Sequence, residues 1–190
     1  MSALIGFVFL GLFSPGPNVI LLTTSGARFG FRPTLPHLFG VALGVGIIAF
    51  FTGLGLGALI VAAPVMRLVL MLIASFWILW MAWALWHAKQ TQSKYTDRPF
   101  TFLEAVLFQW VNPKIWAVAV AASAMVSNVA PISQAVILAV VFSTTNLGVC
   151  LFWTYAGSLL KSLLNDAAKW KIFMRMMAVI LAIFSVLVFL

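Results

Sequence analysis

Two short proline motifs could create a binding site within otherwise apolar stretches of this sequence. The motifs read SPGPN and VNPK, and their residues are Pro15, Gly16, Pro17, Asn18, Asn112, Pro113 and Lys114. An interior proline removes a backbone donor and collides with the preceding turn, which costs a helix roughly 3 kcal/mol. A break at each motif would expose a helix N-terminus, where unpaired N–H groups and partial positive charge favour an anion.

Lys114 is the charged residue that most needs a partner. A charge near the centre of a membrane helix costs ~2.5–3.5 kcal/mol on insertion scales, and Glu104, the nearest acid in sequence, is roughly 15 Å away along a helix. Three arrangements could remove the cost. A carbonyl freed by a break could accept a hydrogen bond from the ammonium group, the amine could be deprotonated and neutral, or an anionic group of a ligand could pair with it. We favour the anion, because two helix N-termini and a cation suit a carboxylate. Asn18 and Asn112 could cap the helix ends or bind the ligand.

A second polar group, STTN, includes Thr144, Thr145 and Asn146 in the middle of another apolar segment. These side chains could hold the polar part of a small solute, or they could bond to neighbouring helices. The sequence leaves both readings open.

The composition defines the elements that must position these residues. The chain has 190 residues, of which 64% are hydrophobic and 7% charged, so it is expected to be an integral membrane protein. A span takes ~20 apolar residues, and the length therefore allows about six. We expect helices over residues 3–27, 36–63, 66–87, 101–127, 131–160 and 171–190, with prolines at or beside the junctions, including Pro36 and Pro131 at the starts of the second and fifth.

The matched positions of Pro15 and Pro113 predict a repeat. The fold class is all-α, a single domain of residues 1–190 in which the transmembrane helices form two inverted three-helix repeats. The halves cover about 1–88 and 100–190, and the loop 87–99 joins them. The first and fourth helices are expected to be broken by proline near the midplane, which is typical of a transporter's substrate site.

Positive charges predict the orientation in the membrane. Arg28, Arg32 and the cations of the loop 87–99 and of residues 161–175 would share one side, and Arg67 would face the other. Because cytoplasmic loops are rich in Lys and Arg, both termini are predicted to be periplasmic or extracellular. Residues 1–11 contain no Lys or Arg, so we expect the first span there rather than a cleaved signal. The net charge of +8 then reflects topology and lipid contact rather than nucleic-acid binding.

The other residues that could do chemistry have simpler interpretations. Gly40 and Gly44 indicate close helix packing more than site lining, and the tryptophans at 77, 80, 83 and 86 indicate packing or an interfacial belt. Cys150, the single cysteine, is expected to be a small buried hydrophobe. The histidines His37 and His87 are expected at loop edges, too far apart in sequence to share a metal. No predicted span pairs a nucleophile with a base, so neither an enzyme nor a cofactor is expected.

The motifs SPGPN and VNPK, with the glycine-rich FGVALGVG between them, resemble those of the LysE/RhtB family of amino-acid exporters, and the length agrees over the whole chain. The resemblance implies export of amino acids or close derivatives from the bacterial cytoplasm across the inner membrane, driven by protons. The proline, glycine, asparagine and lysine positions of the two motifs are those that match. Val45, Gly46 and Ile47 stand where family members often carry a polar or acidic residue, and residues 74–77 replace a usual glycine and tyrosine.

These departures leave no buried carboxylate to carry a proton, so coupling could run through Lys114 or another group. We expect alternating access, with the three-span halves rocking around the site and an amino acid as the substrate. A neutral amino acid fits better than a dibasic one. The alternatives are a carrier for another small solute or ion, or a non-transporting assembly protein, and a homo-oligomer is left open.

Overall fold

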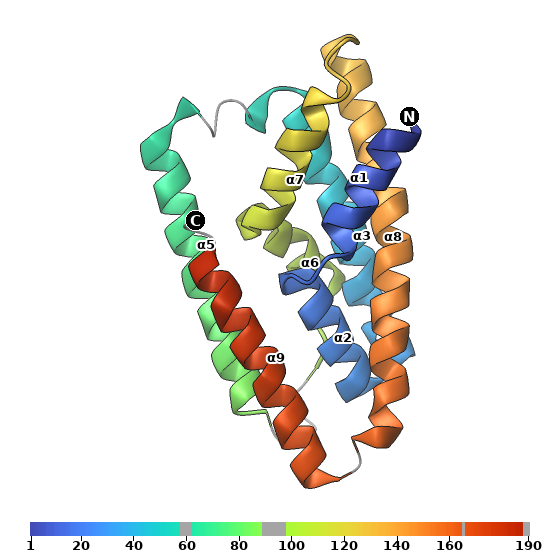
Figure 1. The fold of residues 1–190 in the computed structure, drawn as a ribbon, viewed down its shortest axis with the longest axis vertical. Helices are drawn as coiled ribbons and strands as arrows, with labels where there is room; N and C mark the ends of the chain where they lie inside the picture. The colour runs from blue at the N-terminus through green and yellow to red at the C-terminus, as the bar shows by residue number, and fades with distance from the viewer. Residues whose placement is uncertain (58–61, 89–97, 165, 188–190) are drawn as a thin grey trace.

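The computed structural model describes residues 1–57, 62–88, 98–164 and 166–187 (Figure 1). The regular structure of these residues is helical. The short helix η1 is a 3₁₀ helix, and the others are α-helices. In chain order the elements are α1 (Ser2–Phe13), α2 (Pro17–Phe29), α3 (Phe31–Gly53), α5 (Pro64–Trp86), α6 (Phe102–Phe108), η1 (Gln109–Val111), α7 (Pro113–Ala124), α8 (Pro131–Leu163) and α9 (Ala167–Leu187).

Four of these helices, α3, α5, α8 and α9, are long and apolar enough to cross a membrane. Two further helix pairs pass the same test together, with a bend between their members. The bend is 59° between α1 and α2, and 67° between the segment Phe102–Val111 and α7. If each bent pair is one span, the described residues provide up to 6 spans.

Both bends occur where a proline begins a helix. Pro17 is the first residue of α2, after the extended Gly16, and Pro113 is the first residue of α7, after the extended Asn112. At a first helical position, the missing proline N–H would have had no intrahelical partner in any case. The prolines therefore start new helices after a bend, and each bend leaves an open helix N-terminus.

The prediction for the second helix was wrong at its start. It begins at Phe31, and Pro36 lies inside it rather than at its beginning. A helix can start before Pro36 because its first N–H groups need no intrahelical partner, so one proline shortly afterwards removes few bonds. Gly30, with φ of 97°, separates α2 from α3, since glycine adopts this left-handed conformation without steric cost.

The two bent pairs run in opposite directions (Figure 1). The pair α1 and α2 starts at the upper end of the bundle, where the N-terminus lies, and descends. The pair α6 and α7 ascends to that same end. The last residues of α2, α5 and α8 all lie at the lower end, so the junctions that follow them share one side of the bundle.

The glycines of α3 allow close packing, as predicted. A Cβ on Gly40 would collide with the Phe102 carbonyl oxygen, and one on Gly44 would lie 2.7 Å from Gln109 Cγ. Small residues let helices approach this closely. Gly44 thus makes room for a polar side chain of the facing segment.

Two hydrophobic cores stabilise the bundle. One is built mainly from α1, α3, α7 and α8, and includes Leu38 and Phe142. The other joins α5 to α9 and includes Ile78 and Leu181. Helices α2 and α6 contribute to both cores. Leu22 of α2 and Ala105 of α6 belong to the first core, whereas Ile20 of α2 and Phe108 of α6 belong to the second.

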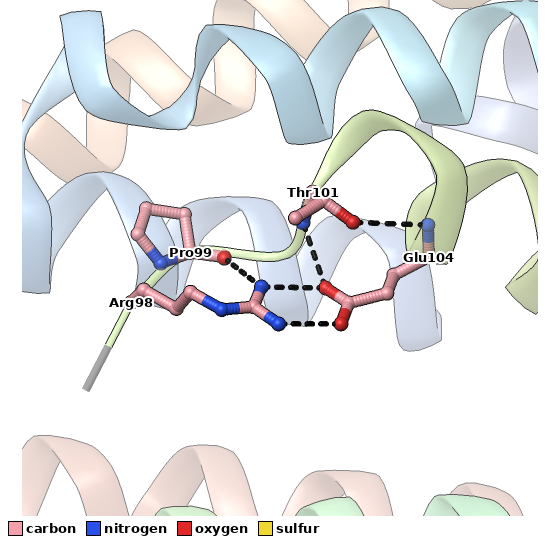
Figure 2. Close-up of polar contacts among 4 residues, drawn as sticks. All are labelled: Arg98, Pro99, Thr101 and Glu104. Carbon is pink, nitrogen blue, oxygen red and sulfur yellow. Dashed lines mark hydrogen bonds and ion pairs between the residues drawn. The ribbon is translucent and has the colours of Figure 1, made fainter. Parts of the chain in front are cut away.

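Charged residues organise the starts of α6 and α9. Figure 2 shows Arg98 donating two hydrogen bonds to the Glu104 carboxylate, at 2.6 and 2.7 Å, while Thr101 and Glu104 form a capping box. Asp166 accepts backbone N–H bonds at the start of α9, and these bonds hold its carboxyl pKa below the usual value. Lys89, Lys94 and Asp97 of the predicted loop lie outside the described residues.

The remaining aromatic and thiol residues divide between surface and interior. All four tryptophans of α5 are exposed, between 41% and 62%, which is compatible with the predicted interfacial belt and not with packing inside the bundle. Cys150 is buried, as predicted. His37 was expected at a loop edge but is buried inside α3 against the Phe100 ring, because α3 starts earlier than expected.

Candidate functional site

The two helix breaks meet at one pocket. Its empty volume is about 230 Å³, open space at its mouth included. The lining residues come from the end of α1, the starts of α2 and α7, and the middle of α8. They are Leu12, Gly16, Asn18, Val19, Asn112, Lys114, Ile115 and Asn146.

Lys114 bridges the two breaks. Its Nζ donates to the carbonyl oxygens of Ser14 and Pro15, the latter at 3.2 Å. These carbonyls follow the C-terminal end of α1, which carries partial negative charge. Within the described residues Lys114 has no carboxylate partner. The ammonium group is therefore held by backbone carbonyls that the break leaves free, which is the first of the three arrangements predicted from the sequence.

Gly16 leaves room for the side chain of Lys114. A Cβ added at Gly16 would lie 2.8 Å from Lys114 Cδ and 2.9 Å from Nζ. The φ of Gly16 is −179°, an extended conformation open to any residue. Glycine therefore leaves room for the end of the lysine side chain, which a larger residue would displace, and the backbone itself does not call for glycine.

Both helix N-termini beside the lysine are open. Gly16 is the N-cap of α2 and Asn112 is the N-cap of α7, and neither end has a side-chain cap in the described part of the chain. The first N–H groups of a helix generally have no intrahelical partner, although Pro17 and Pro113 carry no N–H and the Ile115 N–H donates to the Asn112 carbonyl oxygen at 3.1 Å. The pocket is thus lined by two positive helix ends and an ammonium group, which is an arrangement that binds an anion.

The side chains of Asn18 and Asn112 bond to Gln109 rather than capping these ends. Asn18 Nδ2 donates to Gln109 Oε1 at 2.8 Å, and Gln109 Nε2 donates back to Asn18 Oδ1 at 3.2 Å. Asn112 Nδ2 donates to the same Oε1 at a longer distance of 3.4 Å. Gln109 therefore connects the start of α2 to the start of α7.

Two buried amides at the pocket have unused polar atoms. Asn112 Oδ1 and Asn146 Nδ2 have no hydrogen-bond partner within the described residues. A buried polar atom without a partner costs about 1–3 kcal/mol. A ligand in the pocket could supply the missing partners.

The structure separates the residues of the STTN group. Asn146 is buried and lines the pocket, whereas Thr144 is exposed and donates its hydroxyl hydrogen to the Val140 carbonyl of its own helix, at 2.7 Å. Thr145 is half-buried and is not among the lining residues. Pro15 is exposed and contributes its carbonyl, and Pro17 and Pro113 begin the two helices.

Gln109 is a polar residue beside the pocket that was not predicted from the sequence, and the apolar lining residues Leu12, Val19 and Ile115 were not predicted either. Gln109 is fully buried at the start of η1 and hydrogen-bonds to both asparagines of the breaks. Its signal in the sequence is an amide within an apolar segment, shortly before VNPK. Such an amide is costly in a membrane helix unless it is paired.

The fold and the site define a class, which is a helical membrane protein with a polar pocket between two broken helices. The family model described as LysE type translocator matches residues 9–190. Because this match covers nearly the whole chain, the protein belongs to the LysE translocator family, as the sequence motifs indicated.

Similar proteins include the cysteine/O-acetylserine efflux protein of Escherichia coli O1:K1, 28% identical over 177 residues, which are 89% of this chain and 88% of the relative. The protein of the same name from Salmonella paratyphi A is 28% identical over 115 residues. That match covers 60% of this chain and 59% of the relative's length. No solved structure matches the chain significantly.

Proposed function

We propose that this protein exports amino acids or close derivatives from the cytoplasm by alternating access. The substrate carboxylate would bind between Lys114 and the N-terminal ends of α2 and α7. One observation carries the proposal: both helix breaks line a single pocket and Lys114 spans them. Broken helices whose positive ends face a substrate carboxylate are a recurring design of transporters.

A carboxylate would complete the electrostatics of the pocket. Lys114 is the second residue of α7, so its charge lies at the positive end of its own helix, which is unfavourable. The carbonyls of Ser14 and Pro15 offset this only with partial charges. A carboxylate brings a full negative charge, and it can accept bonds from Lys114 and from the open N–H groups at once.

The substrate is proposed to be a small neutral amino acid. The lining includes one cation, three asparagines and apolar or glycine residues, and no acidic side chain that would favour a dibasic substrate. The relatives named for cysteine and O-acetylserine efflux support this class. Protons are the proposed coupling ion, with Lys114 as the titratable group that faces the pocket.

Counterflow in proteoliposomes tests the function. Vesicles loaded with one unlabelled amino acid and exposed to a trace of labelled cysteine should accumulate label, and a panel of competitors should rank small neutral amino acids first. An imposed pH gradient should change the rate, since the coupling ion is a proton. Absence of counterflow with every amino acid tested would rule out the proposal.

The orientation is proposed from the charges. Arg28 in the last turn of α2 and Lys161 in the last turn of α8 lie at the lower end of Figure 1, at junctions that share one side. The rule that cytoplasmic loops are rich in Lys and Arg places this end in the cytoplasm and both termini outside. The opposite directions of the bent pairs support the proposed inverted repeat.

Cysteine labelling measures this orientation. In a Cys150→Ser background, Ala88→Cys at the lower end is expected to react with a membrane-impermeant maleimide only after cell lysis. Ser2→Cys at the opposite end is expected to react in intact cells. The reverse pattern would place the charged end outside and contradict the proposed export direction.

A further inference from the structure

We propose that Gln109 is a positioning residue that makes Asn112 a hydrogen-bond acceptor for the ammonium group of the substrate. This inference rests on the proposed function, because it concerns how the same pocket would recognise an amino acid. It assigns a role to a residue that touches both helix breaks but is not among the pocket lining.

The orientation of the Gln109 amide is set by the backbone of its own helix. Gln109 Nε2 donates to the Ala105 carbonyl oxygen at 2.9 Å. A carbonyl oxygen can only accept, so a rotated glutamine would place two oxygens against each other. Gln109 is completely buried, and water cannot relieve that repulsion.

The fixed glutamine then fixes Asn112. Gln109 Oε1 faces Asn112 and can only accept, so Asn112 must turn its Nδ2 toward it. The other end of the Asn112 side chain is therefore the oxygen. Asn112 lines the pocket and is 1% exposed, and its Oδ1 has no partner in the described residues.

Asn18 strengthens the arrangement from the other break. Its amide exchanges two hydrogen bonds with Gln109, at 2.8 and 3.2 Å, and because the Ala105 carbonyl already fixes Gln109, these bonds fit one orientation of the Asn18 amide. The result is a pocket with a cation at Lys114 for the carboxylate and an acceptor at Asn112 for the ammonium group. A zwitterion satisfies both, and a simple carboxylic acid satisfies one.

The test compares three related probes in proteoliposomes that contain the full chain. L-cysteine carries both groups, 3-mercaptopropionate lacks the ammonium group, and cysteamine lacks the carboxylate. Each competes with labelled L-cysteine for uptake. Gln109→Met should reduce the preference for cysteine over 3-mercaptopropionate about tenfold or more, since hydrogen bonds to charged groups have that effect. The preference over cysteamine should remain.

Two further variants separate positioning from general damage. Gln109→Glu should keep the ammonium preference when its carboxyl group is protonated, because the hydroxyl can donate to the Ala105 carbonyl as the glutamine amide does, and the other oxygen still accepts from Asn112. Gln134→Met is the matched control, since Gln134 Nε2 also donates to a backbone carbonyl, that of Ser123 at 2.7 Å, away from the pocket. It should leave all three preferences unchanged.

The possible failures are distinguishable. If Gln109→Met weakens all three probes equally, or if Gln109→Glu loses the ammonium preference as Gln109→Met does, the positioning role is wrong while the proposed function stands. If the wild-type protein takes up neither labelled cysteine nor any other small neutral amino acid of the panel, the proposed substrate class fails, and the inference fails with it.

Discussion

Replacement of Lys114 by alanine is expected to abolish export while the protein still inserts into the membrane. The change removes the one cation of the pocket, and loss of one partner from a buried charged pair costs about 2–5 kcal/mol. Export rates from proteoliposomes should fall about a hundredfold or more. Insertion should not suffer, because removal of a charge from a membrane helix is favourable by ~2.5–3.5 kcal/mol on insertion scales.

Two companion variants sharpen this experiment. Lys114→Met retains most of the side-chain volume and should be as inactive as the alanine variant, which would assign the effect to the charge. Lys171→Ala removes an exposed lysine of α9 and should export normally. Normal transport by reconstituted Lys114→Ala protein would disprove the carboxylate site.

Gly16→Val is expected to impair export strongly without unfolding the protein. Since a Cβ at Gly16 would lie 2.8 Å from Lys114 Cδ and 2.9 Å from Nζ, the flexible end of the lysine must move. That movement separates Nζ from the carbonyls of Ser14 and Pro15 and from the helix ends. We expect the transport rate to fall about tenfold to a hundredfold, because the ammonium group of Lys114 would no longer be placed to bond to the substrate carboxylate.

Glycine at a second position gives the control for this change. Gly148, in α8, has open space around it, so Gly148→Val should have little effect on transport. Thermal unfolding of detergent-purified protein should be similar for both variants, since Gly16 has an extended backbone that valine adopts. A Gly16→Val protein that transports like wild type would show that the position of Lys114 does not matter.

The two proline motifs and the lysine could be singled out from the sequence because these residues are exceptions in an apolar chain. Pro17, Pro113 and Lys114 are each costly in a membrane helix, so each required a structural reason. The structure places Pro17 and Pro113 at the first positions of new helices and Lys114 between the breaks. A residue that is costly inside a regular membrane helix can therefore be expected at a helix start or at a polar site.

Other features could not be predicted because they depend on which helix faces meet. Thr144 and Asn146 are two residues apart, and only the structure shows that Asn146 lines the pocket while Thr144 is exposed. Periodicity does not distinguish faces when nearly every residue is apolar. Gln109 was missed for a related reason, since its partner Asn18 lies in the other half of the chain.

The two hydrophobic cores have a consequence for how the protein can move. Helices α3 and α8 share one core and α5 and α9 share the other, although each pair combines helices from both sequence halves. Separation of the halves would open both cores to lipid or water at once. Relative rotation of the two packed units would leave each interior intact, with α2 and α6 flexing because they belong to both. We therefore expect the units that move relative to one another to be defined by packing and not by the order of the chain.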